Sequence, residues 1–60
     1  MKFTTLRLIN KFGENGGEWH ASEVTNHHRK VLKEYRDLEP DADWHFETRG
    51  ELVSWHRFKK

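Results

Sequence analysis

The chain has 60 residues and no cysteine, with 11 Lys or Arg against 10 Asp or Glu, which leaves a formal net charge of +1. Such a length makes a single domain, residues 1–60, and the missing cysteine rules out both a disulfide framework and a thiolate zinc site. Because the charges nearly cancel, bulk charge does not attract nucleic acid, and any such role must rest on a local patch. No long apolar run marks a membrane span or a signal peptide, which predicts a cytoplasmic location.

Residues 1–12 fit two kinds of secondary structure. As a strand, the segment alternates Leu6 and Leu8 with Thr5 and Arg7 over most of its length. As a helix, residues 6–12 present a broad apolar face that would end at Gly13. The next stretch, residues 13–17, is expected to be a loop because Asn-Gly and Gly-Gly break regular structure, and residues 18–21 to be a short edge strand anchored in the core by Trp19.

A helix is predicted from Ser22 to Leu38. Ser22 is a suitable N-cap, Glu23 would place negative charge in the first turn, and Pro40 stops the helix. Apolar positions recur at helical spacing and define one buried face. That face comprises Val24, His28, Val31, Leu32, Tyr35 and Leu38.

Residues 43–58 predict a β-hairpin that turns at Arg49-Gly50. Two runs of aromatic and β-branched residues flank this dipeptide, and glycine supplies the positive φ that a tight hairpin turn needs. Folding about a two-residue turn pairs Trp44 with Trp55 and Phe46 with Val53, so that these four side chains form one apolar face. We expect that face to be covered by the helix.

The order of these elements resembles a winged helix-turn-helix domain. In the resemblance, residues 6–12 are the first helix, residues 14–17 its loop, residues 21–24 the start of the second helix, residues 31–38 the recognition helix and residues 44–58 the wing. It implies a small winged-helix-like α+β domain with a C-terminal β-hairpin that binds DNA. However, the interval from Ala21 to Leu38 is several residues short of two helices and a turn. The alternative fold is ββαββ, with one helix from Ser22 and a first hairpin that turns at Asn15-Gly16.

The best functional feature is a basic stripe on the polar face of the predicted helix. Cations at helical spacing can follow a phosphate backbone, Asn26 and Arg29 could reach base edges, and Arg49 at the hairpin tip could touch a neighbouring phosphate. These residues predict a small double-stranded DNA-binding protein that regulates transcription or recombination. The predicted site comprises Asn26, Arg29, Lys30, Lys33, Arg36 and Arg49.

Other chemistries find less support in the sequence. The five histidines lack the convergent spacing of a zinc site, so no metal and no cofactor are predicted, and His27, His45 and His56 are expected to be solvated. Dispersed acids and the lack of a recognisable nucleophile predict no enzymatic activity. The alternative function is a small protein-binding inhibitor or adaptor of phage or mobile-element type, acting on a host or regulatory protein through an apolar patch. Its candidate residues are Leu52, Phe58 and Phe3.

Overall fold

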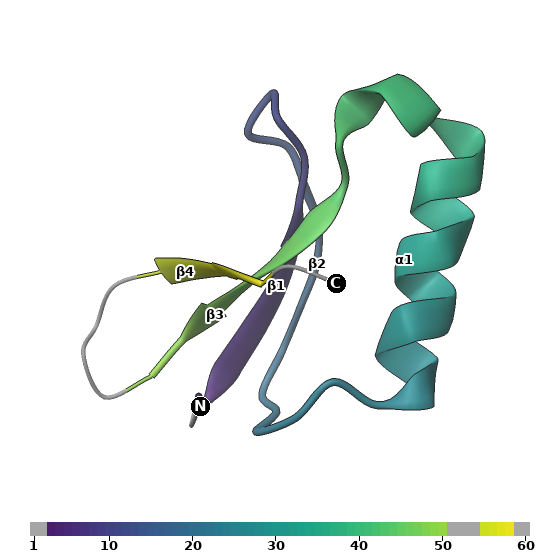
Figure 1. Ribbon diagram of the computed structural model, residues 1–60. Helices are drawn as coiled ribbons and strands as arrows, with labels where there is room; N and C mark the ends of the chain where they lie inside the picture. The colour runs from purple at the N-terminus through teal and green to yellow at the C-terminus, as the bar shows by residue number, and fades with distance from the viewer. Residues whose placement is uncertain (1–2, 51–54, 59–60) are drawn as a thin grey trace.

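The computed structural model describes residues 3–50 and 55–58, and its elements follow in the order ββαββ (Figure 1). The four strands form one antiparallel sheet in the order β2-β1-β3-β4. The helix α1 lies along one side of this sheet (Figure 1), which makes a small α+β fold. The elements are β1 (Thr5–Ile9), β2 (Asn15–Trp19), α1 (Asn26–Leu38), a short 3₁₀ helix (Pro40–Ala42), β3 (His45–Arg49) and β4 (Trp55–Phe58).

The first segment is a strand, so the helix that the winged-helix resemblance implies for residues 6–12 is not formed. Leu6 and Leu8 are fully buried, whereas the residues that alternate with them, Thr5, Arg7 and Ile9, are partly exposed. This alternation is that of a strand with one face on the core. It does not give the continuous apolar face that a buried helix needs. The observed element order is that of the ββαββ alternative.

Asn10 organises the turn between β1 and β2. Its buried side-chain Oδ1 accepts hydrogen bonds from the backbone N–H groups of Phe12 and Glu14, both at 3.0 Å, and Gly13 within the turn has a φ of 82°. The turn therefore lies at residues 10–14, and the predictions of a loop at 13–17 and of a hairpin turn at Asn15-Gly16 are wrong. An asparagine side chain that mimics a backbone turn outweighs the preference of Asn-Gly for positive φ.

The helix begins later than predicted but ends where Pro40 requires. Thr25, not Ser22, is the N-cap of α1, and its backbone N–H donates to Nδ1 of His28 at 3.1 Å. Residues 22–25 therefore precede the helix. At the other end Leu38 is 81% exposed, so its predicted place on the buried face is wrong. The core closes one turn earlier, where the rings of Tyr35 and Trp44 meet edge to face with centroids 4.7 Å apart.

The C-terminal hairpin forms in a register different from the predicted one. Phe46 pairs with Phe58 and Arg49 pairs with Trp55, so the predicted two-residue turn at Arg49-Gly50 is wrong. The expected partner Val53 lies outside the described residues. The observed register sets Arg57 opposite Glu47 and brings its guanidinium to the Asp43 carboxylate at 2.5 Å. A two-residue turn would instead have set Arg57 opposite Ala42.

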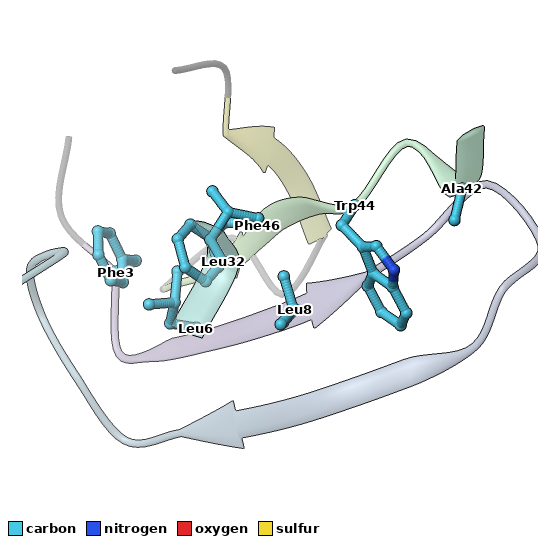
Figure 2. Packing of buried hydrophobic residues seen from close by; sticks show 7 residues of the cluster. All are labelled: Phe3, Leu6, Leu8, Leu32, Ala42, Trp44 and Phe46. Carbon is cyan, nitrogen blue, oxygen red and sulfur yellow. The ribbon is translucent and has the colours of Figure 1, made fainter. Parts of the chain in front are cut away.

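The core lies between α1 and the face of the sheet that carries the even-numbered residues of β1 and β3 (Figure 2). Trp44 and Ala42 occupy one end of the cluster and Phe3 the other (Figure 2), so the expectation that Phe3 contributes an exposed apolar patch is wrong. Trp19 packs against the cluster as predicted, with its ring edge to face with His28 at 5.0 Å. The buried hydrophobic residues are Phe3, Leu6, Leu8, Leu32, Ala42, Trp44 and Phe46.

Candidate nucleic-acid interface

The side of α1 that faces away from the sheet carries four of the six predicted site residues. These four, here called the basic helix side, are Asn26, Arg29, Lys30 and Lys33, and all four are exposed. Lys33 donates to the exposed carboxylate of Asp37 at 3.1 Å, one helical turn further on. Among residues 3–50 and 55–58 no acidic side chain pairs with Arg29 or Lys30. Both of these cations are available to an anionic partner.

Charge is unevenly distributed along α1. The first turn holds no acidic residue, because Glu23, predicted to lie there, precedes the helix. The positive end of the helix dipole therefore adds to the charges of Arg29 and Lys30, which favours a bound anion at this end. Exposed acids occur only in the second half, at Glu34 and Asp37. The net positive charge of α1 is thus concentrated in the N-terminal half of the basic helix side.

Arg36 does not belong to the basic helix side. Its side chain is partly buried, and its Nε donates a hydrogen bond of 3.0 Å to the backbone carbonyl of Trp44. The residue therefore joins the end of α1 to the segment that leads into β3. Helical spacing alone placed it on the stripe, but this contact with a distant part of the chain gives it a structural role.

Arg49 lies on the other side of the molecule from the basic helix side. Its neighbour Thr48 is 1% exposed and points into the core, so the alternation of β3 directs Arg49 to the face of the sheet that α1 does not cover. There the Arg49 guanidinium carbon lies 5.8 Å from the centroid of the Trp55 ring. The predicted site is therefore divided between two surfaces, and one flat duplex face cannot contact both at once.

The uncovered face of the sheet holds a charged and aromatic group that the sequence did not predict. This open-face cluster comprises Arg7, His45, Glu47, Arg49 and Trp55. Arg7 Nη2 donates to Glu47 Oε1 at 2.6 Å, and the Arg7 guanidinium carbon lies 4.0 Å from the Trp55 ring centroid. The other Glu47 oxygen lies 3.5 Å from His45 Nε2. Period-two alternation in a strand reading of residues 5–9 was the signal that placed Arg7 away from the core, but nothing local showed that β3 pairs with it.

Burial and hydrogen bonding compete at Glu47. Burial raises the pKa of the Glu47 carboxyl, but hydrogen bonds and charge from Arg7 and His45 outweigh this and leave the pKa below its ordinary value of 4.5. His45 is itself buried, and its Nδ1–H donates to the Asp43 carbonyl at 2.7 Å. The prediction that His45 is solvated is therefore wrong. The carboxylate of Glu47 stays ionised at neutral pH and holds the Arg7 guanidinium in place.

His28 is buried in neutral form beneath the helix N-terminus. Its Nδ1 accepts the Thr25 N–H, and its ring packs against Trp19 and Phe46. Burial lowers the pKa of His28 from its ordinary 6.5, and the neighbouring charge of His27 lowers it further. A protonated Nδ1 could not accept the capping hydrogen bond.

Acidification is therefore expected to destabilise the fold through His28. On acidification, His28 binds a proton in the unfolded chain at a higher pH than in the folded chain. The stabilisation from neutral His28 is therefore complete above pH 6.5 and is lost as the pH falls through 6.5 toward the lower pKa of the folded state. Thermal unfolding followed between about pH 7.5 and pH 5 measures the loss. His28→Gln is the matched control, because an amide can accept the Thr25 N–H without titrating. Equal pH sensitivity in the two proteins would assign the effect to another group.

In the described part of the chain, no group of three or more His, Asp or Glu side chains is arranged to hold a metal ion. Among the same residues, no helix has the length and apolar character needed to cross a membrane. Comparison of the chain with protein-family models, with curated proteins and with solved structures finds no match.

Proposed function

We propose that this protein binds double-stranded DNA through the basic helix side of α1. The observation that carries the proposal is the exposed run of Arg29, Lys30 and Lys33 on one side of a helix whose first turn lacks an acid. Cations in such a row neutralise successive phosphates, and a helix N-terminus adds backbone N–H groups and a positive dipole end. Asn26 at the first helical position could contact base edges in the major groove. Regulation of transcription or recombination is the role that such binding would serve.

Removing cations from the basic helix side should weaken binding and its dependence on salt. Each phosphate contact contributes close to one unit to the slope of log affinity against log salt, so Lys30→Ala with Lys33→Ala should reduce the slope by about two. Both side chains are exposed, so the fold should be retained. The measurement is a titration of labelled duplex DNA at several salt concentrations, with a melting curve for each protein.

The matched control removes two cations elsewhere. Lys11→Ala with Arg49→Ala changes the net charge by the same amount, but Lys11 lies in the β1–β2 turn and Arg49 lies on the uncovered sheet face. The control should bind duplex DNA with nearly the wild-type slope. An equal reduction in both double variants would show that net charge alone attracts the duplex. Wild-type protein that fails to bind duplex even at low salt would refute the proposal.

Protein binding is the second candidate function, and two exposed side chains favour it. Phe12 in the β1–β2 turn is 68% exposed and Leu38 at the end of α1 is 81% exposed. A contiguous apolar patch to which such side chains contribute is typical of surfaces that contact another protein. Such an interface would respond little to salt, whereas binding to the basic helix side must weaken steeply as salt rises.

A further inference from the structure

Trp55 is a tryptophan that lies outside the core. Its register opposite Arg49 and its contact with Arg7 set the ring on the sheet face away from α1, where it stays partly exposed. Trp44, in contrast, is only 4% exposed within the core. A tryptophan stabilises a small fold chiefly through the apolar area that it buries. Core packing therefore does not explain why this large aromatic ring stands on the uncovered face.

Contacts with polar neighbours hold the Trp55 ring in position. Arg7 approaches the Trp55 ring to 4.0 Å and is itself held by Glu47 at 2.6 Å. A cation over the indole face is an attractive contact, and the ion pair restricts where the guanidinium can move. The ring thus has a supported position on the sheet before any partner arrives, which lowers the entropy cost of binding.

The charge beside the ring is positive. Arg49 is exposed, lies 5.8 Å from the ring centroid and pairs with no acidic residue in the described ranges. The carboxylate of Glu47, two residues before Arg49 on β3, already contacts both Arg7 and His45. Arg57 on β4 is likewise paired, with Asp43. An anion that reaches the Trp55 ring therefore meets the exposed charge of Arg49, which no acid among residues 3–50 and 55–58 neutralises.

We propose that the open-face cluster binds single-stranded nucleic acid, with one base stacked on Trp55 and an adjacent phosphate at Arg49. An unpaired base offers a flat aromatic face, and its backbone carries the negative charge that complements the Arg49 guanidinium. Tryptophan and arginine also occur in protein interfaces, but the exposed cation beside the ring favours a polyanion over a neutral protein surface. This surface lies opposite the basic helix side, so the inference does not depend on duplex binding.

The test uses a fluorescein-labelled oligothymidine of about eight nucleotides, a length within the site size of one small domain, titrated with the full chain. Trp55→Ala should lower the affinity by about 5- to 100-fold, as expected for loss of one stacked base. Trp55→Phe should retain part of the affinity, because a smaller ring still stacks. Arg49→Ala should weaken binding and reduce the salt slope by about one. Lys11→Ala, which removes an exposed cation from the β1–β2 turn, serves as the control and should bind the oligonucleotide like wild type.

A second measurement covers the case in which Trp55→Ala disturbs the fold. Wild-type protein is irradiated with an oligonucleotide that carries 5-iodouracil, and the cross-linked peptide is identified by mass spectrometry. A cross-link at Trp55 supports the proposal, and cross-links confined to α1 overturn it. The proposal also fails if wild type does not bind the oligonucleotide at low salt, or if Lys11→Ala loses as much affinity as Trp55→Ala. Loss of duplex binding alone would bear only on the function proposed for the basic helix side.

Discussion

Trp44→Ala is expected to unfold most of the protein at room temperature. The indole is 4% exposed, packs edge to face on Tyr35 and donates from Nε1 to Glu39 Oε1 at 3.3 Å. Replacing a buried tryptophan by alanine costs about 3–5 kcal/mol, which is as much as one small core supplies in a chain of this size. Thermal unfolding followed by circular dichroism would show a transition shifted far down or no cooperative transition at all.

Trp55→Ala is the matched control for this experiment. The two substitutions remove the same side chain, one from the segment that leads into β3 and one from β4, but Trp55 lies on the uncovered face and contacts Arg7 instead of the core. Its loss should cost much less, because a cation–π contact at a partly exposed site contributes about 1 kcal/mol. Equal destabilisation by the two substitutions would contradict the observed register of the hairpin.

Gly16→Ala is expected to destabilise the fold although it adds one methyl group. A Cβ at this position would lie 2.9 Å from Tyr35 Cε2, 3.1 Å from Trp44 Cζ3 and 3.2 Å from Leu8 Cδ2. The backbone is also held there, since the Tyr35 hydroxyl donates to the Gly16 carbonyl at 3.0 Å. Overpacking of this kind costs about 1–3 kcal/mol. Chemical denaturation of the variant measures the decrease in the free energy of unfolding.

Gly17→Ala is the control for the crowding at Gly16. A Cβ there would approach only the ring of Trp19, at 2.8 Å, and that ring is partly exposed, whereas three different side chains surround a Cβ added at Gly16. The loss of stability should therefore be smaller than at Gly16. If Gly17→Ala were the more damaging substitution, close packing of β2 against Tyr35 and Trp44 would not be the reason that glycine is required.

The parts of the fold that were predicted correctly depend on local chemistry. Pro40 ended the helix after Leu38, and Trp19, Leu32 and Phe46 reached the core as their spacing indicated. The hairpin register could not be predicted from local chemistry, because the period-two alternation of side chains is compatible with several turn lengths. The choice depends on contacts such as that of Arg57 with Asp43, which are distant in sequence. Similarly, the buried side chain of Asn10 moved the first turn away from Asn15-Gly16.

The candidate site was predictable where one helix determines it. Helical spacing correctly grouped Asn26, Arg29, Lys30 and Lys33 on one exposed side. It could not show that Arg36 bonds to the carbonyl of Trp44.

The open-face cluster could not be predicted from local patterns. The link between Arg7 and Glu47 joins residues 40 positions apart, and only the pairing of β1 with β3 brings them together. The same pairing accounts for the position of Arg49, because it decides which face of the sheet each strand residue occupies.

The order of strands in the sheet has a consequence for how the chain folds. The central strands β1 and β3 come from opposite halves of the sequence, and each half also supplies one outer strand. Neither half can therefore complete a core alone, since an isolated hairpin is marginal in water and its apolar face needs the other hairpin and α1. The search for this long-range pairing must precede most of the burial, which favours an all-or-none transition limited by loop closure. A chain cut between β2 and α1 would yield two fragments that become ordered only when they associate.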